Sequence, residues 1–193
     1  IIPPEGVRNV LGQPVPWELC TTMNNNWGYC PSDRDYKPAS MLVRKLVECV
    51  SKGGNMILNV GPDAQGRFSE ESCRLLEEIG KWMARNGESI YGCGNAELPK
   101  PEWGWYTRKG NRFYAHVLDA PIGPLALTGV DKRKIERIRL LRDGSQVRRG
   151  ESWVTSAYDG VPFVTLGAVA HYTYPLPDAT DTVLEITFRE DEP

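Results

Sequence analysis

The stretch GGNMILNV, residues 53 to 60, is followed directly by GPDAQG. Its two glycines allow a tight turn from a helix into a strand, and the apolar run after them ends on Asn59. The run is apolar at both alternating positions, as in a strand that is covered on both faces in a parallel sheet. Gly61-Pro62 then breaks the strand and begins a loop. The stretch therefore predicts a buried strand with a loop at its carboxyl end.

Helical patterns flank this strand on both sides. Before it, Ser40 begins a run with apolar residues at helical spacing, and Gly53 supplies the stop signal. After it, Ser69 caps a second run of this kind, which Gly87 ends. An earlier stretch, WELCTTM at residues 17 to 23, is strand-like. The apolar face predicted for the second helix consists of Cys73, Leu75, Leu76, Ile79, Trp82 and Met83.

The resulting order of strand, helix, strand and helix is typical of a parallel α/β sheet or barrel. An eight-stranded barrel takes ~250 residues, far more than this part of the chain contains. The sequence therefore predicts either a small open sheet or the final part of a barrel.

The pattern changes after residue 100, where short alternating runs are separated by turn signals such as Asp143-Gly144. Short strands at such spacing favour an antiparallel β-sandwich. Proline and glycine cluster near residues 94 to 102, so we expect two domains, residues 1–98 and 99–193. The predicted strands of the second domain lie at residues 112–119, 135–144, 151–160, 161–167 and 181–190.

Composition limits the classes of protein to which the chain belongs. Its 193 residues are 40% hydrophobic and 25% charged, as in a globular protein. A net charge of −2 gives no electrostatic reason to expect nucleic acid or an anionic membrane as a partner. The first residues lack the features of a signal peptide, and there is no initiator Met. We therefore expect the natural start to lie upstream, which leaves targeting open.

The five cysteines, Cys20, Cys30, Cys49, Cys73 and Cys93, contain no CxxC pair. The sequence therefore predicts no zinc site, and it shows no signal for another metal or a cofactor. Cys49 and Cys73 fall within the helical patterns and are predicted to be small core residues. Reduced thiols, rather than a disulfide framework, favour a cytoplasmic over a secreted protein.

In an α/β barrel the functional residues gather at the carboxyl ends of the strands. This rule points to the loop that begins at Asn59 and to the stretch NNNWGYC, residues 24 to 30. Trp27 and Tyr29 are able to form an apolar wall for a sugar ring, with the amides of residues 24–26 as hydrogen-bonding groups. Composition alone favours the alternative of a core tryptophan beneath a surface loop.

Three motifs carry a resemblance to a known family: PWELCTTMNNNWGY, LVECVSKGGNMILNVGPDAQGRF and LEEIGKWMARNGESIYG. In this order and spacing they resemble the last third of the catalytic domain of α-L-fucosidases of glycoside hydrolase family 29. The resemblance covers about residues 10 to 95; the remainder matches only in general, as the sandwich that follows the barrel. It implies the final strands and helices of a (β/α)8-like barrel followed by an antiparallel β-sandwich. The implied reaction is retaining hydrolysis of terminal α-L-fucose, without metal or cofactor.

Retaining glycosidases use two carboxyl groups, a nucleophile and an acid/base. The resemblance implies that the nucleophile is an aspartate on an earlier strand, upstream of these residues. In one branch of the family the acid/base aligns with Glu18, and in another it comes from a loop further upstream. The position of Glu18 near the amino end of its strand favours a structural carboxylate instead, pairing with Arg44 or Arg85. Glu5 is a weaker candidate, expected to be a solvated loop charge.

The resemblance implies that Trp27 packs against the fucose and its C6 methyl group. Asn59 is expected to order the loop backbone rather than contact the substrate. We expect His116 and His171 to be structural. Trp103 and Trp105 are expected to seal the barrel against the sandwich, with a sugar platform as the alternative. The basic segment at residues 131–150 is predicted to be a solvated face.

The expected partner is therefore a fucosylated glycan, with an upstream half of the barrel required for activity. The alternative is a non-catalytic carbohydrate-binding or structural β-sandwich module with a vestigial half-barrel.

Overall fold

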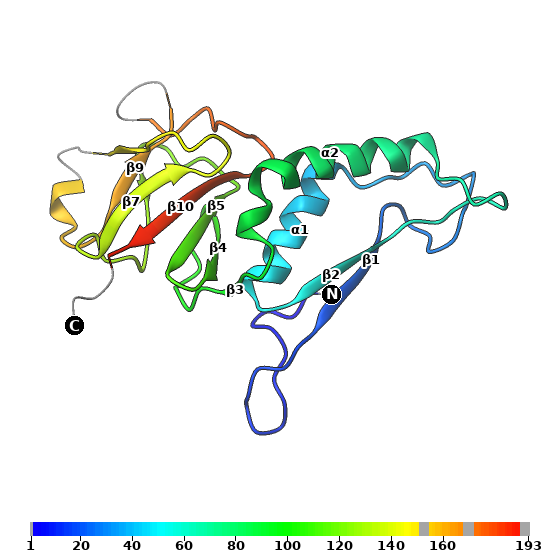
Figure 1. Cartoon of the computed structure of the whole chain (residues 1–193), viewed down its shortest axis with the longest axis horizontal. Coiled ribbons are helices and arrows are strands. Elements are labelled where there is room, and N and C mark those ends of the chain that lie inside the picture. Colours follow the sequence, from blue (N-terminus) through cyan, green and yellow to red (C-terminus); the bar gives the residue numbers. More distant parts are fainter. Residues whose placement is uncertain (1, 151–154, 168–171, 190–193) are drawn as a thin grey trace.

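The computed structural model describes residues 2–150, 155–167 and 172–189. Its first part is a parallel β–α–β unit followed by a helix (Figure 1). β1 (Glu18–Thr22) and β2 (Asn55–Asn59) pair in parallel, with Glu18 opposite Asn55 and Thr22 opposite Asn59. α1 (Ala39–Ser51) connects them, and α2 (Glu70–Asn86) follows, continued by the short 3-10 helix η1 (Gly87–Ser89). These elements confirm the predicted order of strand, helix, strand and helix.

Three of the four helix ends form where the sequence signals lie, whereas α1 begins at Ala39, one residue before the predicted Ser40, without a side-chain cap. Gly53 adopts the left-handed φ of 73° just beyond α1, and its N–H donates to the carbonyl of Val50 over 2.9 Å. At the start of α2, Ser69 Oγ accepts the N–H of Ser72 over 3.2 Å. Gly87 follows the last residue of α2, as predicted, although its φ of −58° is right-handed.

The buried stripe of α2 is narrower than predicted. It consists of Ser72, Leu75, Trp82 and Asn86, which recur three, seven and four residues apart on one side of the helix. Cys73 directly follows Ser72 in sequence, but it lies outside this stripe and is exposed. The prediction of a core residue at Cys73 is therefore wrong. Cys49, in contrast, is completely buried in α1, as predicted.

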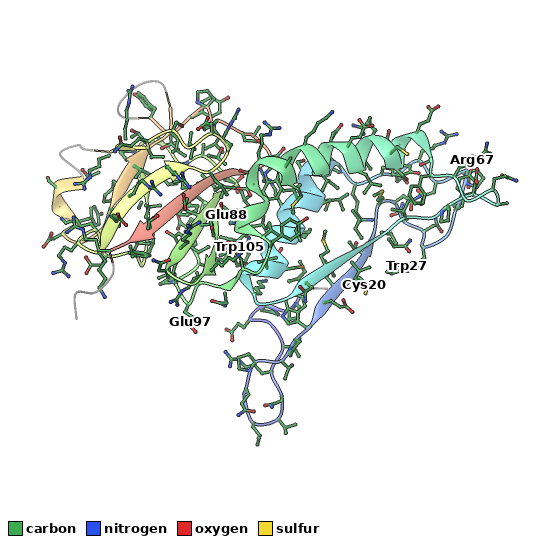
Figure 2. All side chains as sticks on the ribbon, viewed as in Figure 1. Cys20, Trp27, Arg67, Glu88, Glu97 and Trp105 are labelled. Atoms are coloured by element: carbon green, nitrogen blue, oxygen red, sulfur yellow. The ribbon has the colours of Figure 1, made fainter. Side chains whose placement is uncertain are left out.

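The β1–β2 pair is covered on one side only. Leu58 packs with Met23 and with Leu75 of α2, on the side of the helices. On the other face Ile57 is 47% exposed and Cys20 is also exposed. Figure 2 shows Cys20 and Trp27 on the side of the strand pair turned away from α1 and α2. The sequence predicts that this strand is covered on both faces, but the described residues cover only one of them.

The second part is a sandwich of two antiparallel sheets, as predicted. A five-stranded sheet has the order β3-β4-β5-β10-β7, and a three-stranded sheet has the order β6-β9-β8. The side chains between them, among them Phe113, Leu125 and Ile186, form the largest apolar core. The strands are β3 (Gly94–Asn95), β4 (Gly104–Lys109), β5 (Arg112–Val117), β6 (Leu125–Ala126), β7 (Ile135–Leu140), β8 (Arg148–Arg149), β9 (Phe163–Thr165) and β10 (Thr182–Phe188).

Four of the five strand predictions contain an observed strand, namely β5, β7, β9 and β10. The fifth, residues 151–160, is wrong where it can be compared, because Thr155–Ala157 forms the 3-10 helix η2. This turn is closed by the N–H of Tyr158, which donates to the carbonyl of Thr155 over 3.2 Å. Residues 151–154 lie outside the described residues.

The five-stranded sheet also packs against the helices. Val43 and Val47 of α1 and Trp82 of α2 share an apolar cluster with Tyr114 of β5 and Val183 of β10. The two helices therefore lie between the β1–β2 pair and the five-stranded sheet, and the three-stranded sheet lies on the other side of the five-stranded one (Figure 1).

The two tryptophans near the predicted boundary lie in different layers. Trp105 packs in the cluster with the helices, as predicted, with the Nζ atoms of Lys52 and Lys100 at 4.9 and 4.8 Å from its ring centre. Trp103 instead lies inside the sandwich core, where its Nε1–H donates to the carbonyl of Ala126 over 2.9 Å. The prediction that Trp103 seals the barrel against the sandwich is therefore wrong.

His116 of β5 is completely buried and structural, as predicted. Its Nδ1 lies 2.7 Å from Oδ2 of the equally buried Asp181, and its Nε2 lies 3.1 Å from Oγ1 of Thr107. The Thr107 hydroxyl donates to the carbonyl of Ser89. These contacts connect β5, β4, η1 and the residue before β10. His171 lies outside the described residues.

Candidate active site at the carboxyl ends of β1 and β2

Two loops begin at the same edge of the β1–β2 pair, one at residues 23–38 and one at residues 60–69. Their backbones are in direct contact at Gly61. A Cβ at that position would lie 2.6 Å from the carbonyl carbon of Gly28 and 2.7 Å from the nitrogen of Tyr29. Glycine therefore permits the close approach, and any side chain there would push the two loops apart.

Asn59, the last residue of β2, connects the same two loops by a hydrogen bond. Its Nδ2 donates to the backbone carbonyl of Trp27 over 2.6 Å. The prediction that Asn59 orders the loop backbone is confirmed by this contact.

Asp33 holds the loop just before Trp27. Its Oδ2 accepts the N–H of Asn25 over 2.9 Å and the side-chain amide of Asn26 over 2.6 Å, and its Oδ1 accepts the N–H of Asp35 over 3.1 Å. Partial desolvation raises the pKa of Asp33, but the hydrogen bonds, that of the Asn26 amide first, outweigh it and lower the pKa below its usual value. The carboxylate is thus an acceptor used within the loop.

Lys37 anchors the other end of this segment. Its Nζ donates to the carbonyl of Asn24 over 2.6 Å and lies 3.3 Å from Oγ1 of Thr22 at the end of β1. The Asn24 amide oxygen accepts the N–H of Asn26 over 3.2 Å. The side chains of Asn24 and Asn26, considered above as ligands for a sugar, therefore hold the loop itself.

The aromatic side chains of this loop are left open. Trp27 is 58% exposed and Tyr29 is 51% exposed. Within the described residues, Trp27 is therefore not packed into a core. The space enclosed between the two loops is only about 10 Å3, so a sugar has no room between them. The surface available to a ligand is the open face beyond Trp27.

Comparisons with known proteins point to one family. The sequence model of the α-L-fucosidase family matches residues 4–88. The α-L-fucosidase of Dictyostelium discoideum is 38% identical over 110 residues, which are 54% of this chain and 24% of that protein. The human tissue α-L-fucosidase is 36% identical over 115 residues, again 54% of this chain and 24% of that protein.

A solved structure agrees more closely. α-L-Fucosidase isoenzyme 1 from Paenibacillus thiaminolyticus is 49% identical and superimposes with a TM-score of 0.91 over 98% of this chain and 44% of that one. The chain belongs to the α-L-fucosidase family. The predicted resemblance is confirmed, and the chain spans about a quarter of the length of the two curated relatives.

A further structure shows the chemistry of a relative. A family 29 α-L-fucosidase from Bacteroides thetaiotaomicron, trapped as a covalent intermediate with 2-fluoro-fucosyl fluoride, superimposes with a TM-score of 0.74. It is 29% identical, over 91% of this chain and 38% of that one.

The fucosidase candidate acid/base, Glu18, lies at the opposite end of β1 from Trp27. It is the first residue of the strand and is exposed. Strand residues rise ~3.3 Å each, so Glu18 lies about 13 Å along β1 from Thr22. Because Glu18 and Cys20 are two residues apart, both side chains project from the same open face. The structure thus places Glu18 and Trp27 on one face but does not bring them together.

The alternative partners of Glu18 are engaged elsewhere. Arg44 donates to the carbonyls of Leu118 over 2.7 Å and Thr180 over 3.2 Å. Arg85 donates to the carbonyl of Lys81 over 3.2 Å. Neither arginine pairs with Glu18 in the described part of the chain, and Glu5 is an exposed turn residue, as expected.

Sequence reasoning missed Asp33 and Lys37, which hold the Trp27 loop. The cluster PSDRD at residues 31 to 35 was the available signal, because aspartate in such turns accepts nearby backbone N–H groups.

Across residues 2–150, 155–167 and 172–189, no group of three or more His, Cys, Asp or Glu side chains is able to hold a metal ion. Within the same residues, no helix is both long and apolar enough to cross a bilayer.

A cleft of about 890 Å3 lies apart from this site, in the sandwich. Its lining includes Arg137 and Arg149 and the aromatic residues Tyr158 and Phe163. The rings of the two aromatic residues are tilted at 56°, with 6.0 Å between their centres.

Proposed function

We propose that these residues form the carboxyl-terminal part of a retaining α-L-fucosidase, and that they contribute one wall of its sugar site. The observation that carries this proposal is the exposed Trp27 on a tightly held loop at the carboxyl ends of two parallel strands. The family's match to residues 4–88 includes this loop. A fixed, exposed aromatic side chain suits a 6-deoxy sugar, because packing of a methyl-sized group contributes ~0.8 kcal/mol.

Within this proposal, β1, α1, β2 and α2 are the final elements of a (β/α)8-like barrel, residues 1–98, and residues 99–193 form the sandwich domain. The open face of Ile57 and Cys20 supports it, since apolar strand residues of a barrel are covered by the other strands. An upstream half of the barrel then supplies this cover.

The proposed chemistry uses two carboxyl groups. An aspartate outside these residues attacks the anomeric carbon as the bond to the leaving oxygen breaks, and the acid/base gives that oxygen its proton. The acid/base then takes a proton from water. The oxygen of this water displaces the aspartate from the anomeric carbon and releases fucose with retained configuration. Glu18 is our candidate for this residue because it is the single carboxylate within β1 and β2. The proposed substrate is a fucosylated glycan, and the five free cysteines support a reducing, cytoplasmic location.

The test is hydrolysis of 4-nitrophenyl α-L-fucoside by the full-length protein that contains these residues. We expect release of nitrophenol, a product of retained configuration by NMR, and a rise in KM for Trp27→Ala. The corresponding β-D-galactoside is the control for sugar selectivity. Release at the background rate would refute the proposal.

The sandwich cleft supports a second candidate, the carbohydrate-binding module. Tyr158 in that cleft is 56% exposed, and an exposed aromatic ring is a common surface for sugar stacking. Glycan-array binding that Tyr158→Ala abolishes, in a protein that hydrolyses no fucoside, would favour this candidate.

A further inference from the structure

We propose that Asn59 is a positioning residue, which fixes the Trp27 indole as a preorganised wall for the sugar by holding the Trp27 carbonyl. This inference rests on the proposed function. Asn59 acts through the loop and does not itself contact the substrate.

The first step is the rigidity of Asn59 itself. It is paired with Thr22 in the β1–β2 register, so its backbone is part of the sheet. From there its Nδ2 reaches the Trp27 carbonyl over 2.6 Å, across thirty-two residues of sequence. The bond therefore ties a loop that follows β1 to the end of β2.

The second step is that the residues on both sides of Trp27 are held as well. Before it, Asp33 accepts the N–H of Asn25 and the amide of Asn26. After it, the backbone of Gly28 lies directly against Gly61. The carbonyl of Trp27 lies between these two anchors, and Asn59 is the residue that holds it. Once the carbonyl is held, the backbone that carries the indole is fixed, while the residue remains 58% exposed.

The third step connects this geometry to catalysis. A ligand that packs on an already ordered side chain does not spend binding free energy on ordering it. Packing of the fucose methyl group is the same in the ground state and in the transition state, since that group takes no part in the reaction. Loss of order at Trp27 should therefore raise KM and leave kcat nearly unchanged.

The test is Asn59→Asp in the full-length protein. The variant has the same shape, but it replaces the donating amide with a carboxylate oxygen that faces the Trp27 carbonyl. We expect KM for 4-nitrophenyl α-L-fucoside to rise about 3- to 10-fold, the range for loss of one hydrogen bond, with kcat within about twofold. Hydrogen exchange of the backbone amides at residues 25–30 should become faster. Asn111→Asp, the same change at an exposed residue just before β5, should alter neither quantity.

A double-mutant cycle with Trp27→Ala tests whether Asn59 acts through the indole. In the Trp27→Ala background, Asn59→Asp should raise KM no further, because the wall is already absent. If Asn59→Asp does not fold, Asn59→Ala removes the same donor without adding a charge and replaces it in the cycle.

The outcomes separate this inference from the proposed function. No fucoside hydrolysis by the unmodified protein would refute the fucosidase, while faster exchange at residues 25–30 in the variant would still support the anchoring bond. Unchanged KM and unchanged exchange in Asn59→Asp would refute the positioning role. A large fall in kcat with unchanged exchange would also refute it, because Asn59 would then contact the reacting sugar.

Discussion

At the scale of single residues, the polar side chains near Trp27 are hydrogen-bonded within their loops, whereas the carboxylate of Glu18 is exposed. Asn26, Asp33 and Asn59 each have a partner within the loops, so their polar groups serve the loop structure. Glu18 is exposed on the open face. A carboxylate placed in this way is available to a group from elsewhere in a larger protein.

The role proposed for Glu18 predicts a specific kinetic defect in Glu18→Gln. The amide cannot transfer the proton, so kcat for a fucoside with a poor leaving group should fall about 10²- to 10⁴-fold. For 4-nitrophenyl α-L-fucoside, whose leaving group needs little protonation, the first step should change less, and added azide should restore turnover. Steady-state kinetics on the two substrates measure this. A change below about threefold on both would assign the acid/base to the upstream loop of the other branch of the family.

At the scale of elements, the buried hydrogen-bonding group around His116 connects β4, β5 and the start of β10. Apolar packing alone fixes the relative position of such elements less specifically, because it is non-directional. Asp181 precedes β10, His116 lies on β5 and Thr107 lies on β4. The Thr107 hydroxyl donates to a backbone carbonyl, so it accepts a hydrogen from Nε2 of His116. With no exposed surface at His116 or Asp181, the group is structural and has no access to a substrate.

Removal of Asp181 should therefore destabilise the fold. Asp181→Ala leaves Nδ1 of His116 buried without a hydrogen-bond partner, which costs about 1–3 kcal/mol. Asp181→Asn should cost less, since its side-chain amide is still able to form a hydrogen bond with Nδ1. Asp119→Ala, which removes an exposed ion pair to Arg44 of 3.6 Å, should cost below about 1 kcal/mol and is the control. Urea unfolding compares the free energies, and equal values for the two alanine variants would contradict this role.

Asp181 also makes the stability of the fold depend on pH. Burial raises the pKa of Asp181 above its ordinary value of 3.8, against the lowering effect of His116, so the folded chain binds this proton more tightly than the unfolded chain. The resulting stabilisation is complete below pH 3.8 and is lost as the pH rises through the folded pKa. The side chain of Asp181→Asn does not titrate. The difference in free energy of unfolding between the wild type and this variant should therefore narrow as the pH rises above 3.8.

The elements that the sequence predicted well are those with both a period and an end signal. α2 has apolar residues at helical spacing, a capping Ser69 and a terminal Gly87. β6 and β8 were missed because strands of two residues are too short to show alternation. β4 was missed because the prolines and glycines before it obscure the pattern of its aromatic residues.

The candidate site was predictable only in part, because a sequence pattern reveals where strands end but not which groups meet in a folded loop. Trp27 and Asn59 lie where strands end, which a strand pattern reveals. Asp33 and Lys37 act on backbone groups such as the Asn24 carbonyl, and these partners exist only once the loop is folded. The narrow buried stripe of α2 likewise depends on which neighbours pack against it, and Cys73 shows that apolar character alone does not decide burial.

At the scale of the whole molecule, the open face of β1 and β2 is the feature that a complete barrel would change. Cys20 is exposed there, while Cys49 is completely buried, and burial raises the pKa of the Cys49 thiol to about 11. The two cysteines therefore report on different surfaces of the chain.

We predict that N-ethylmaleimide labels Cys20 in the chain of residues 1–193 but not in the native full-length protein. The other strands of the proposed barrel would exclude the reagent from this face. Peptide mass mapping gives the extent of labelling at each cysteine. Cys49 should stay unlabelled in both folded forms, and labelling of both residues in urea confirms that they can react. Rapid labelling of Cys20 in the native full-length protein would contradict a closed barrel.

The five-stranded sheet, finally, takes part in two cores at once. Neighbouring residues alternate between them: Tyr114 and Val183 face the helices, whereas Ala115 and Leu184 face the sandwich. A gene fusion that exchanged this sandwich for an unrelated one would leave the valines of α1 without the surface that they fit. The helices and the sandwich should accordingly have been inherited as a unit, with substitutions on one side of their contact compensated on the other.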